Sequence, residues 1–182
     1  MKAPEAKVEK TEHGSLPTTA GWFLLNAADG CWHESPRFGR YWSIEGKGEA
    51  RFQEVGVNIH MLAAGQRACL YHRESAQEGF LVLFGTCTLV VEDEERQMRQ
   101  WDYFHCPPGV HHVFVGKSAE PCAILMLGRR DPKLELHYPV SEVAARHGAS
   151  TLTATSDPRV AYEGTPPPLP STARAPFSEV DS

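Results

Sequence analysis

The chain has 182 residues, 41% of them hydrophobic and 23% charged, and its formal net charge is −5. This length suits one domain with tails, or two small domains, and is ample for a core that needs neither disulfides nor a metal to hold it together. The acidic balance and the lack of a basic block argue against nucleic acid as a partner. The apolar runs, such as 80–84 and 122–127, are too short to cross a bilayer, so we expect no membrane partner.

The cysteines and the first residues of the chain indicate a reducing compartment. The five cysteines are widely spaced and form no C-x-x-C motif, which excludes a zinc ribbon and a thioredoxin-like redox motif. No apolar stretch follows the N-terminal charges, so no secretory signal is predicted. We therefore expect a cytoplasmic protein with reduced thiols. At least four cysteines should act as small buried hydrophobes, whereas the role of Cys106 stays open.

In chain order, the sequence predicts two disordered arms around one domain. Residues 1–20 contain only Val8 and Leu16 as sizeable aliphatics, too little to offset the cost of ordering the chain. The domain is expected to cover residues 21–150. Residues 151–182, with the run Pro-Pro-Pro-Leu-Pro near their middle, are expected to form a Pro-rich disordered tail.

Within the domain, short apolar or alternating runs are separated by Gly, Pro or acidic turns, which predicts strand after strand. We expect strands at 22–26, 55–62, 69–74, 79–84, 86–91, 96–100, 101–106, 111–115 and 121–127. One short helix is predicted over 142–147, with Ser141 as its N-cap and Gly148 after its end. Strands at this spacing are typical of an all-β sandwich or barrel, here with a peripheral helix.

Side chains that can bind metals gather in two segments near predicted strand ends. Side chains two apart on a strand share a face, so His72 and Glu74 should point the same way. A tight turn at 75–77 would bring Glu78 back beside them. The apolar residues that follow on the expected inward face are Phe80, Val82 and Phe84. A carboxylate at the rim of an apolar interior is unfavourable unless it is ligated or paired, so this pattern indicates a site.

The first segment resembles the first motif of the cupin superfamily, G-x5-H-x-H-x3-E-x6-G. Glu78 is followed after six residues by Gly85, and counting back places His72 and Glu74 where the family has its two histidines. The chain departs from the motif in two ways: Glu74 replaces the second histidine, and Gly65 stands one residue early.

The second segment resembles the second cupin motif, G-x5-P-x-G-x2-H-x3-N. Pro107-x-Gly109-x2-His112 matches its centre, whereas Trp101 replaces the first glycine and Gly116 the final asparagine. Together the two motifs extend the resemblance over about residues 50–128.

The resemblance implies a small single-domain cupin, a double-stranded β-helix (jelly-roll barrel) whose interior holds one divalent metal ion. Carried over position by position, the metal ligands would be His72, Glu74, Glu78 and His112. Two imidazoles and one carboxylate already form the facial set of non-haem Fe(II) enzymes. Glu74 would either complete a site for Mn, Fe, Ni or Zn, or stay unligated as a catalytic general base. Without a cation the two carboxylates would repel, and one would have to protonate.

We therefore expect a metal-dependent enzyme for a low-molecular-weight substrate, of the dioxygenase, isomerase or lyase type. The alternative is a cupin module that binds a small molecule or metal without turnover. Leu81 and Leu83 should face away from the interior, where they would pack under N-terminal strands or form the seam of a homodimer. His111 should face away from His112, and His60 should be a satisfied or exposed strand residue.

Overall fold

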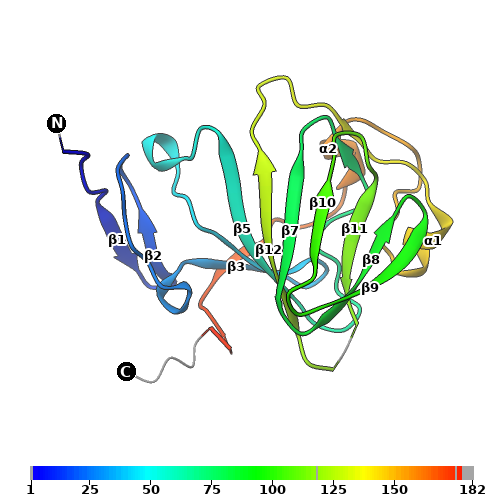
Figure 1. Cartoon of the computed structure of the whole chain (residues 1–182), viewed down its shortest axis with the longest axis horizontal. Coiled ribbons are helices and arrows are strands. Elements are labelled where there is room, and N and C mark those ends of the chain that lie inside the picture. The colour runs from blue at the N-terminus through cyan, green and yellow to red at the C-terminus, as the bar shows by residue number, and fades with distance from the viewer. Residues whose placement is uncertain (1, 118, 175, 178–182) are drawn as a thin grey trace.

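Antiparallel strands make up most of the regular structure in the computed structural model, which describes residues 2–117, 119–174 and 176–177 (Figure 1). The strands are β1 (Val8–Thr11), β2 (Gly14–Pro17), β3 (Trp32–Ser35), β4 (Gly39–Ser43), β5 (Val55–Leu62), β6 (Arg73–Glu74), β7 (Glu78–Phe84), β8 (Thr86–Val91), β9 (Glu94–Arg99), β10 (Tyr103–Cys106), β11 (His112–Gly116), β12 (Cys122–Arg129), β13 (Leu136–His137) and β14 (Leu169–Ser171). The helices are α1 (Glu142–Arg146) and α2 (Pro158–Ala161), with 3-10 turns at Ala27–Asp29 and Gly48–Ala50.

Two sheets build the barrel. The larger has the strand order β10-β7-β12-β5-β4-β3-β14, and the smaller has the order β11-β8-β9. Figure 1 shows the smaller sheet beside the β7 and β10 end of the larger one. Their inward side chains form one core cluster, which includes Leu62, Phe80, Val82 and Ile124 from the larger sheet and Cys87, Leu89, Met98 and Phe114 from the smaller. The predicted all-β jelly-roll fold is therefore confirmed.

The alternation of β7 is confirmed for Phe80 and Val82, which are buried in this core, but the prediction for Phe84 is wrong. The pairing of β7 with β12 shifts register between Ala123 and Ile124. Beyond that shift, Phe84 packs on a second cluster on the outer face of the larger sheet. This outer cluster is formed by Trp32, Trp42, Ile59, Met61 and Ala123, with Leu25, Ala27, Leu83, Phe84 and Phe177 packed against it.

The strand prediction also failed between residues 22 and 43. Residues 22–26 do not form the predicted strand, since Trp22 makes an isolated β-bridge and the other four residues pair with no strand. The strands β3 and β4 were missed because charged and polar residues interrupt them. Their burial depends on Trp32 and Trp42, whose rings lie 6.2 Å apart in the outer cluster. A single large ring on each short strand supplies the apolar area that a run of aliphatics would otherwise provide.

The short helix forms where the sequence predicts it. The Ser141 hydroxyl accepts a hydrogen bond from the Ala144 N–H at 3.0 Å, which caps α1. Gly148 follows the helix with a φ of +64°, a left-handed conformation that suits glycine. Among the described residues, no helix is long and apolar enough to span a membrane.

The ends of the chain have regular structure where disordered arms were expected. β1 and β2 pair as a hairpin, and the Ala6 N–H donates to the Trp22 carbonyl at 2.9 Å. β14, within the Pro-rich segment, pairs with the edge strand β3. Backbone hydrogen bonds order both segments together with local apolar contacts, because β1 is exposed throughout but Ala6 is buried and Phe177 packs on the outer cluster. Residues 178–182 of the expected tail lie outside the described residues.

Two glycines share a left-handed backbone conformation but differ in the space around them. Substitutions at the two positions therefore distinguish the cost of backbone strain from the cost of steric overlap. Gly85 has a φ of +74° and Gly65 a φ of +76°. A Cβ at residue 85 would stand 2.7 Å from the Pro121 carbonyl oxygen, whereas one at residue 65 would meet nothing within 4 Å.

We expect Gly65→Ala to lower the free energy of unfolding by about 1 kcal/mol, the cost of a left-handed alanine. Gly85→Ala should lower it by about 3 kcal/mol, because overlap adds to the strain. Urea unfolding followed by circular dichroism measures both. Equal losses would show that the strand end near residue 85 relaxes freely.

Candidate metal centre

Backbone pairing brings the two predicted histidine ligands together. His72 and His112 form an antiparallel bridge, in which the His112 N–H donates to the His72 carbonyl at 2.8 Å and the reverse bond measures 3.3 Å. Their ring centroids are 5.2 Å apart. Both side chains are enclosed, with residue exposures of 9% and 2%. Two segments far apart in the sequence thus present their imidazoles side by side inside the barrel.

The two predicted carboxylates each face one imidazole. Glu74 on β6 lies two residues beyond His72, and its Oε1 is 3.6 Å from His72 Nε2. Glu78 begins β7 after the turn, and its Oε2 is 3.6 Å from His112 Nε2. Atoms bound to one ion at about 2.0–2.2 Å stand roughly 3–3.5 Å from each other. Each imidazole–carboxylate pair is therefore at nearly that spacing, whereas, among the described residues, the three ligand-type side chains whose atoms all lie within 4.8 Å of one another are Glu78, His112 and Cys106.

The imidazoles are held in the same tautomer. Nδ1 of His72 lies 2.8 Å from the Leu70 carbonyl oxygen, and Nδ1 of His112 lies 3.2 Å from that of Val110. A carbonyl oxygen only accepts, so each Nδ1 carries the hydrogen and donates it. Nε2 of each ring then faces a carboxylate, the arrangement in which a backbone group orients a metal-binding histidine once the ring is neutral.

Two thiols that sequence reasoning did not assign lie behind the rings. Cys69 Sγ is 3.6 Å from His72 Nδ1, and Cys106 Sγ is 3.5 Å from His112 Nδ1. Ligand-type atoms of Glu78, Cys106 and His112 all lie within 4.8 Å of one another. Cys106, however, lies on the Nδ1 side of the ring, away from the lone pair that faces Glu78. Burial raises the pKa of its thiol to about 12, so Cys106 is neutral as long as no cation is bound beside it.

The electrostatics of the group leave one negative charge poorly balanced. Burial, and then repulsion from Glu74, raise the pKa of Glu78 to about 7. Burial and the neighbouring His72 lower the pKa of His112 to about 3, so this ring is neutral. Burial opposes protonation of His72, but Cys69 and Glu74 together hold its pKa well above the usual value. Glu78 Oε2 is buried and has no hydrogen-bond partner among the described residues.

These residues fit a divalent cation. A buried carboxylate oxygen without a partner is costly, and a cation beside it would remove both that cost and the repulsion from Glu74. Two imidazole nitrogens and two carboxylate oxygens suit Mn, Fe, Ni or Zn, as imidazole and carboxylate are ligands of intermediate and hard character. His72, Glu74, Glu78 and His112 could hold such an ion.

An aromatic floor closes one side of the group. The Phe80 ring centroid is 5.0 Å from that of His112 and 4.8 Å from that of Phe114. Phe104, which sequence reasoning did not select, lies 6.0 Å from His112. Large apolar rings at this depth keep water away from the imidazoles, which strengthens electrostatic interactions in the site.

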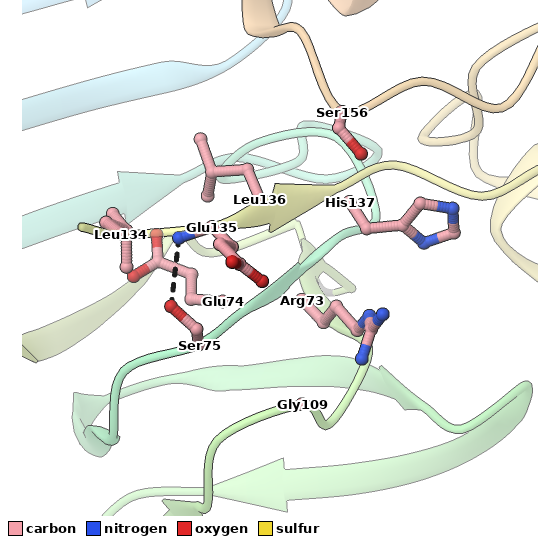
Figure 2. Close-up of a pocket in the computed structure, with 9 residues that line it drawn as sticks. All are labelled: Arg73, Glu74, Ser75, Gly109, Leu134, Glu135, Leu136, His137 and Ser156. Carbon is pink, nitrogen blue, oxygen red and sulfur yellow. Dashed lines mark hydrogen bonds between the residues drawn. The ribbon is translucent and has the colours of Figure 1, made fainter.

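Two cavities open onto the carboxylates. One has a volume of about 460 Å³ and is lined by Glu74, Glu78 and Phe80 together with polar and basic residues of the strand ends, among them Asn58, Arg51 and Arg129. The other cavity has a volume of about 410 Å³ and is lined by Glu74, Arg73 and His137, among others (Figure 2). Glu74 lines both cavities, so it is the member of the group that a bound small molecule would reach from either side.

Neighbouring polar side chains stand outside the group. His111 stacks on Tyr71, with ring centroids 5.7 Å apart, and its Nε2 lies 3.2 Å from His137 Nδ1. The hydroxyl of Tyr71, a buried residue, accepts a hydrogen bond from the Asp93 N–H at 2.9 Å. His111 therefore faces away from His112, as predicted, and supports the surrounding loops.

Comparison with known proteins agrees with this fold. Residues 58–128 match the cupin domain family, and no curated protein matches the chain. This segment is therefore similar to a cupin domain, as the two motifs predict. The polyketide cyclase RemF from Streptomyces resistomycificus is similar in structure, with a TM-score of 0.53 and 14% identity over 62% of this chain and 83% of that one. At this identity the likeness shows the fold alone.

Two further structures are similar at lower TM-scores. A sugar phosphate isomerase from a cupin superfamily of Silicibacter pomeroyi has a TM-score of 0.48 and 25% identity, over 65% of this chain and 73% of that chain. A proposed sugar phosphate isomerase from Acidithiobacillus ferrooxidans has a TM-score of 0.49 and 18% identity over 54% of this chain. The match spans 64% of that protein, less than two thirds of its length.

The buried charge of Glu78 yields a test. With metal removed by a chelator at pH 8, Glu78→Gln should raise the free energy of unfolding by about 2 kcal/mol, since it removes an ionised group that is buried beside a second carboxylate. The matched control Glu54→Gln, at an exposed glutamate, should change it by less than about 0.5 kcal/mol. Chemical unfolding measures both. A less stable Glu78→Gln protein would mean that protein groups alone compensate this charge.

Proposed function

We propose that this cupin binds one divalent metal ion through His72, Glu74, Glu78 and His112 and is a metal-dependent enzyme for a low-molecular-weight substrate. The observation that carries the proposal is the buried Glu78 Oε2, which has no hydrogen-bond partner among the described residues and faces His112 Nε2 at 3.6 Å. A cation is the chemical species that both atoms would bind together.

When bound, the ion would supply Lewis acidity toward a substrate carbonyl or hydroxyl. The protein would supply the rest. Leu70 and Val110 orient the imidazoles through their carbonyls, and Phe80 excludes water from one side. Glu74 lines both cavities, so it would either ligate the ion or take a proton from the substrate as a general base.

The proposed reaction on a small molecule is of the dioxygenase, isomerase or lyase type. The pocket of about 460 Å³ at the carboxylates is within the usual size range for such substrates. Because one fold hosts many chemistries, the named activities of similar structures do not select among these types.

We further propose a homodimer and a cytoplasmic location. Leu83 packs on the outer cluster within the chain, but Tyr103, paired with Leu81 on the same face, is 58% exposed and leaves apolar surface for a second copy. All five cysteines, each within the described residues, are free thiols, which suits a reducing compartment.

Metal content tests the ligand assignment. We expect the purified protein to contain close to one equivalent of metal, and the double variant His72→Ala, His112→Ala to lose it, because both imidazole ligands are gone. The matched double variant His13→Ala, His105→Ala removes two histidines outside the group and should keep the metal. Elemental analysis after dialysis measures all three. Equal content in the two double variants contradicts the assignment.

Glu74→His separates the two roles of Glu74. The substitution restores the cupin pattern, so we expect metal affinity to be kept or increased. Competition with a chromophoric chelator measures it. Loss of the ion would show that an anion is required at this position.

Catalysis requires ligand positions that the protein leaves open. His72, Glu74, Glu78 and His112 would leave positions for exchangeable water on an ion that takes more than four ligands, and a substrate could displace that water. With Mn(II) bound, water proton relaxation should therefore be enhanced, and Glu78→Gln, which weakens binding, should lower the enhancement. A tightly held ion without exchangeable water would contradict the enzyme and favour a non-catalytic binding module.

A further inference from the structure

A second cavity lies on the flank of the barrel. Its volume is about 300 Å³, and its walls include the aromatic rings of Phe38, Tyr41 and Tyr162. None of the four candidate metal ligands lines it. Among the described residues that do, only His60 has a side chain that could become charged near neutral pH. The cavity is thus an apolar space distinct from the metal centre and at the lower end of the size range of small-molecule pockets.

The chain covers this cavity with an anchored strap, residues 165–168. On one side of the strap, the Tyr162 hydroxyl accepts a hydrogen bond from the Leu70 N–H at 3.0 Å. On the other side, β14 pairs with β3. Three of the four strap residues are prolines, which have no N–H to leave unsatisfied over an apolar space. The strap therefore forms one wall of the cavity at little cost in hydrogen bonds.

One polar atom in this apolar space has no partner. His60 Nδ1 is buried and makes no hydrogen bond among the described residues. The ring is held by stacking on Tyr41, with centroids 5.4 Å apart, and Tyr41 in turn stacks on His33 at 5.1 Å. Burial lowers the pKa of His60 to about 4, so the ring is neutral at neutral pH. His60 lines the cavity, so a ligand that shifts the packing over its buried Nδ1 could satisfy this unpaired nitrogen.

We propose that this cavity binds a small, neutral aromatic molecule with one hydroxyl group, and that the hydroxyl pairs with His60 Nδ1. A hydroxyl suits either tautomer, because it can donate to a bare nitrogen or accept from an N–H. The rings of Phe38, Tyr41 and Tyr162 favour an aromatic body. A charged ligand would be desolvated without a compensating charge on the lining side chains.

Phenol and toluene are the probes, because they differ in the hydroxyl that the proposal requires. Titrated into the full chain and followed by isothermal calorimetry, phenol should bind at least about tenfold more tightly than toluene, the ratio expected when a buried polar atom gains its partner. Equal affinities, or no binding of phenol, overturn the proposal.

His60→Phe removes the nitrogen and keeps a ring of similar size. It should lower the affinity for phenol about tenfold and leave that for toluene the same or higher. The control His105→Phe, at an exposed histidine of β10, should change neither. A His60→Phe protein that still prefers phenol over toluene overturns the proposal.

If the His60→Phe variant does not fold, a measurement on the wild-type protein still tests the proposal. The 15N resonance of His60 Nδ1 should shift on addition of phenol and stay within error on addition of toluene. The same response to both probes, or to neither, overturns the proposal. Metal removal should not alter these results, since no candidate metal ligand lines the cavity.

Discussion

The backbone pairing of His72 with His112 is the interaction on which the candidate centre depends. It joins the segment before β6 to the start of β11, and it places two imidazoles 5.2 Å apart where no continuous stretch of sequence could. The carbonyls of Leu70 and Val110 then turn both Nε2 atoms toward the carboxylates. Ring position and ring orientation thus come from the backbone, before any ion contributes.

The charges of the group lead to the same conclusion as its geometry. Glu78 is held beside Glu74 in a buried setting, and the protein relieves this in part through His72, whose pKa is raised, while the pKa of Glu78 is still raised to about 7. Natural proteins retain such an arrangement where a cation, a substrate or a proton transfer uses it. The aromatic floor of Phe80 and Phe114 increases the effect, because it lowers the local dielectric. A cation between the pairs would lower the free energy of the whole group.

The features of the fold that depend on neighbouring residues in the chain could be predicted from the sequence. The Ser141 cap and the inward alternation of Phe80 and Val82 follow from local spacing, and both are confirmed. Phe84 could not be predicted, because a register shift in the pairing of β7 with β12 decides its side of the sheet. The convergence of His72 and Glu78 with His112 was expected from two motifs, since the cupin pattern already encodes the pairing of distant strands.

The residues that surround the candidate site could not be predicted from the sequence, for a different reason. The contacts of Cys69 and Cys106 with the imidazoles depend on ring rotation, and that of Phe104 on sheet packing. The flank cavity depends on a Pro-rich segment that composition alone predicts to be disordered but that β3 holds in place. Edge pairing of this kind leaves no pattern in the sequence of the segment that is captured.

We propose that His72, Glu74, Glu78 and His112 would hold one divalent ion. Crystals of protein loaded with Mn(II), measured at a wavelength where manganese scatters anomalously, test it most directly. The account predicts a single strong anomalous peak at bonding distance, about 2.0–2.3 Å, from Nε2 of both His72 and His112 and from a Glu78 oxygen. A peak at another position, or a well-ordered Glu78 that shares a proton with Glu74 and no peak beside it, would contradict it.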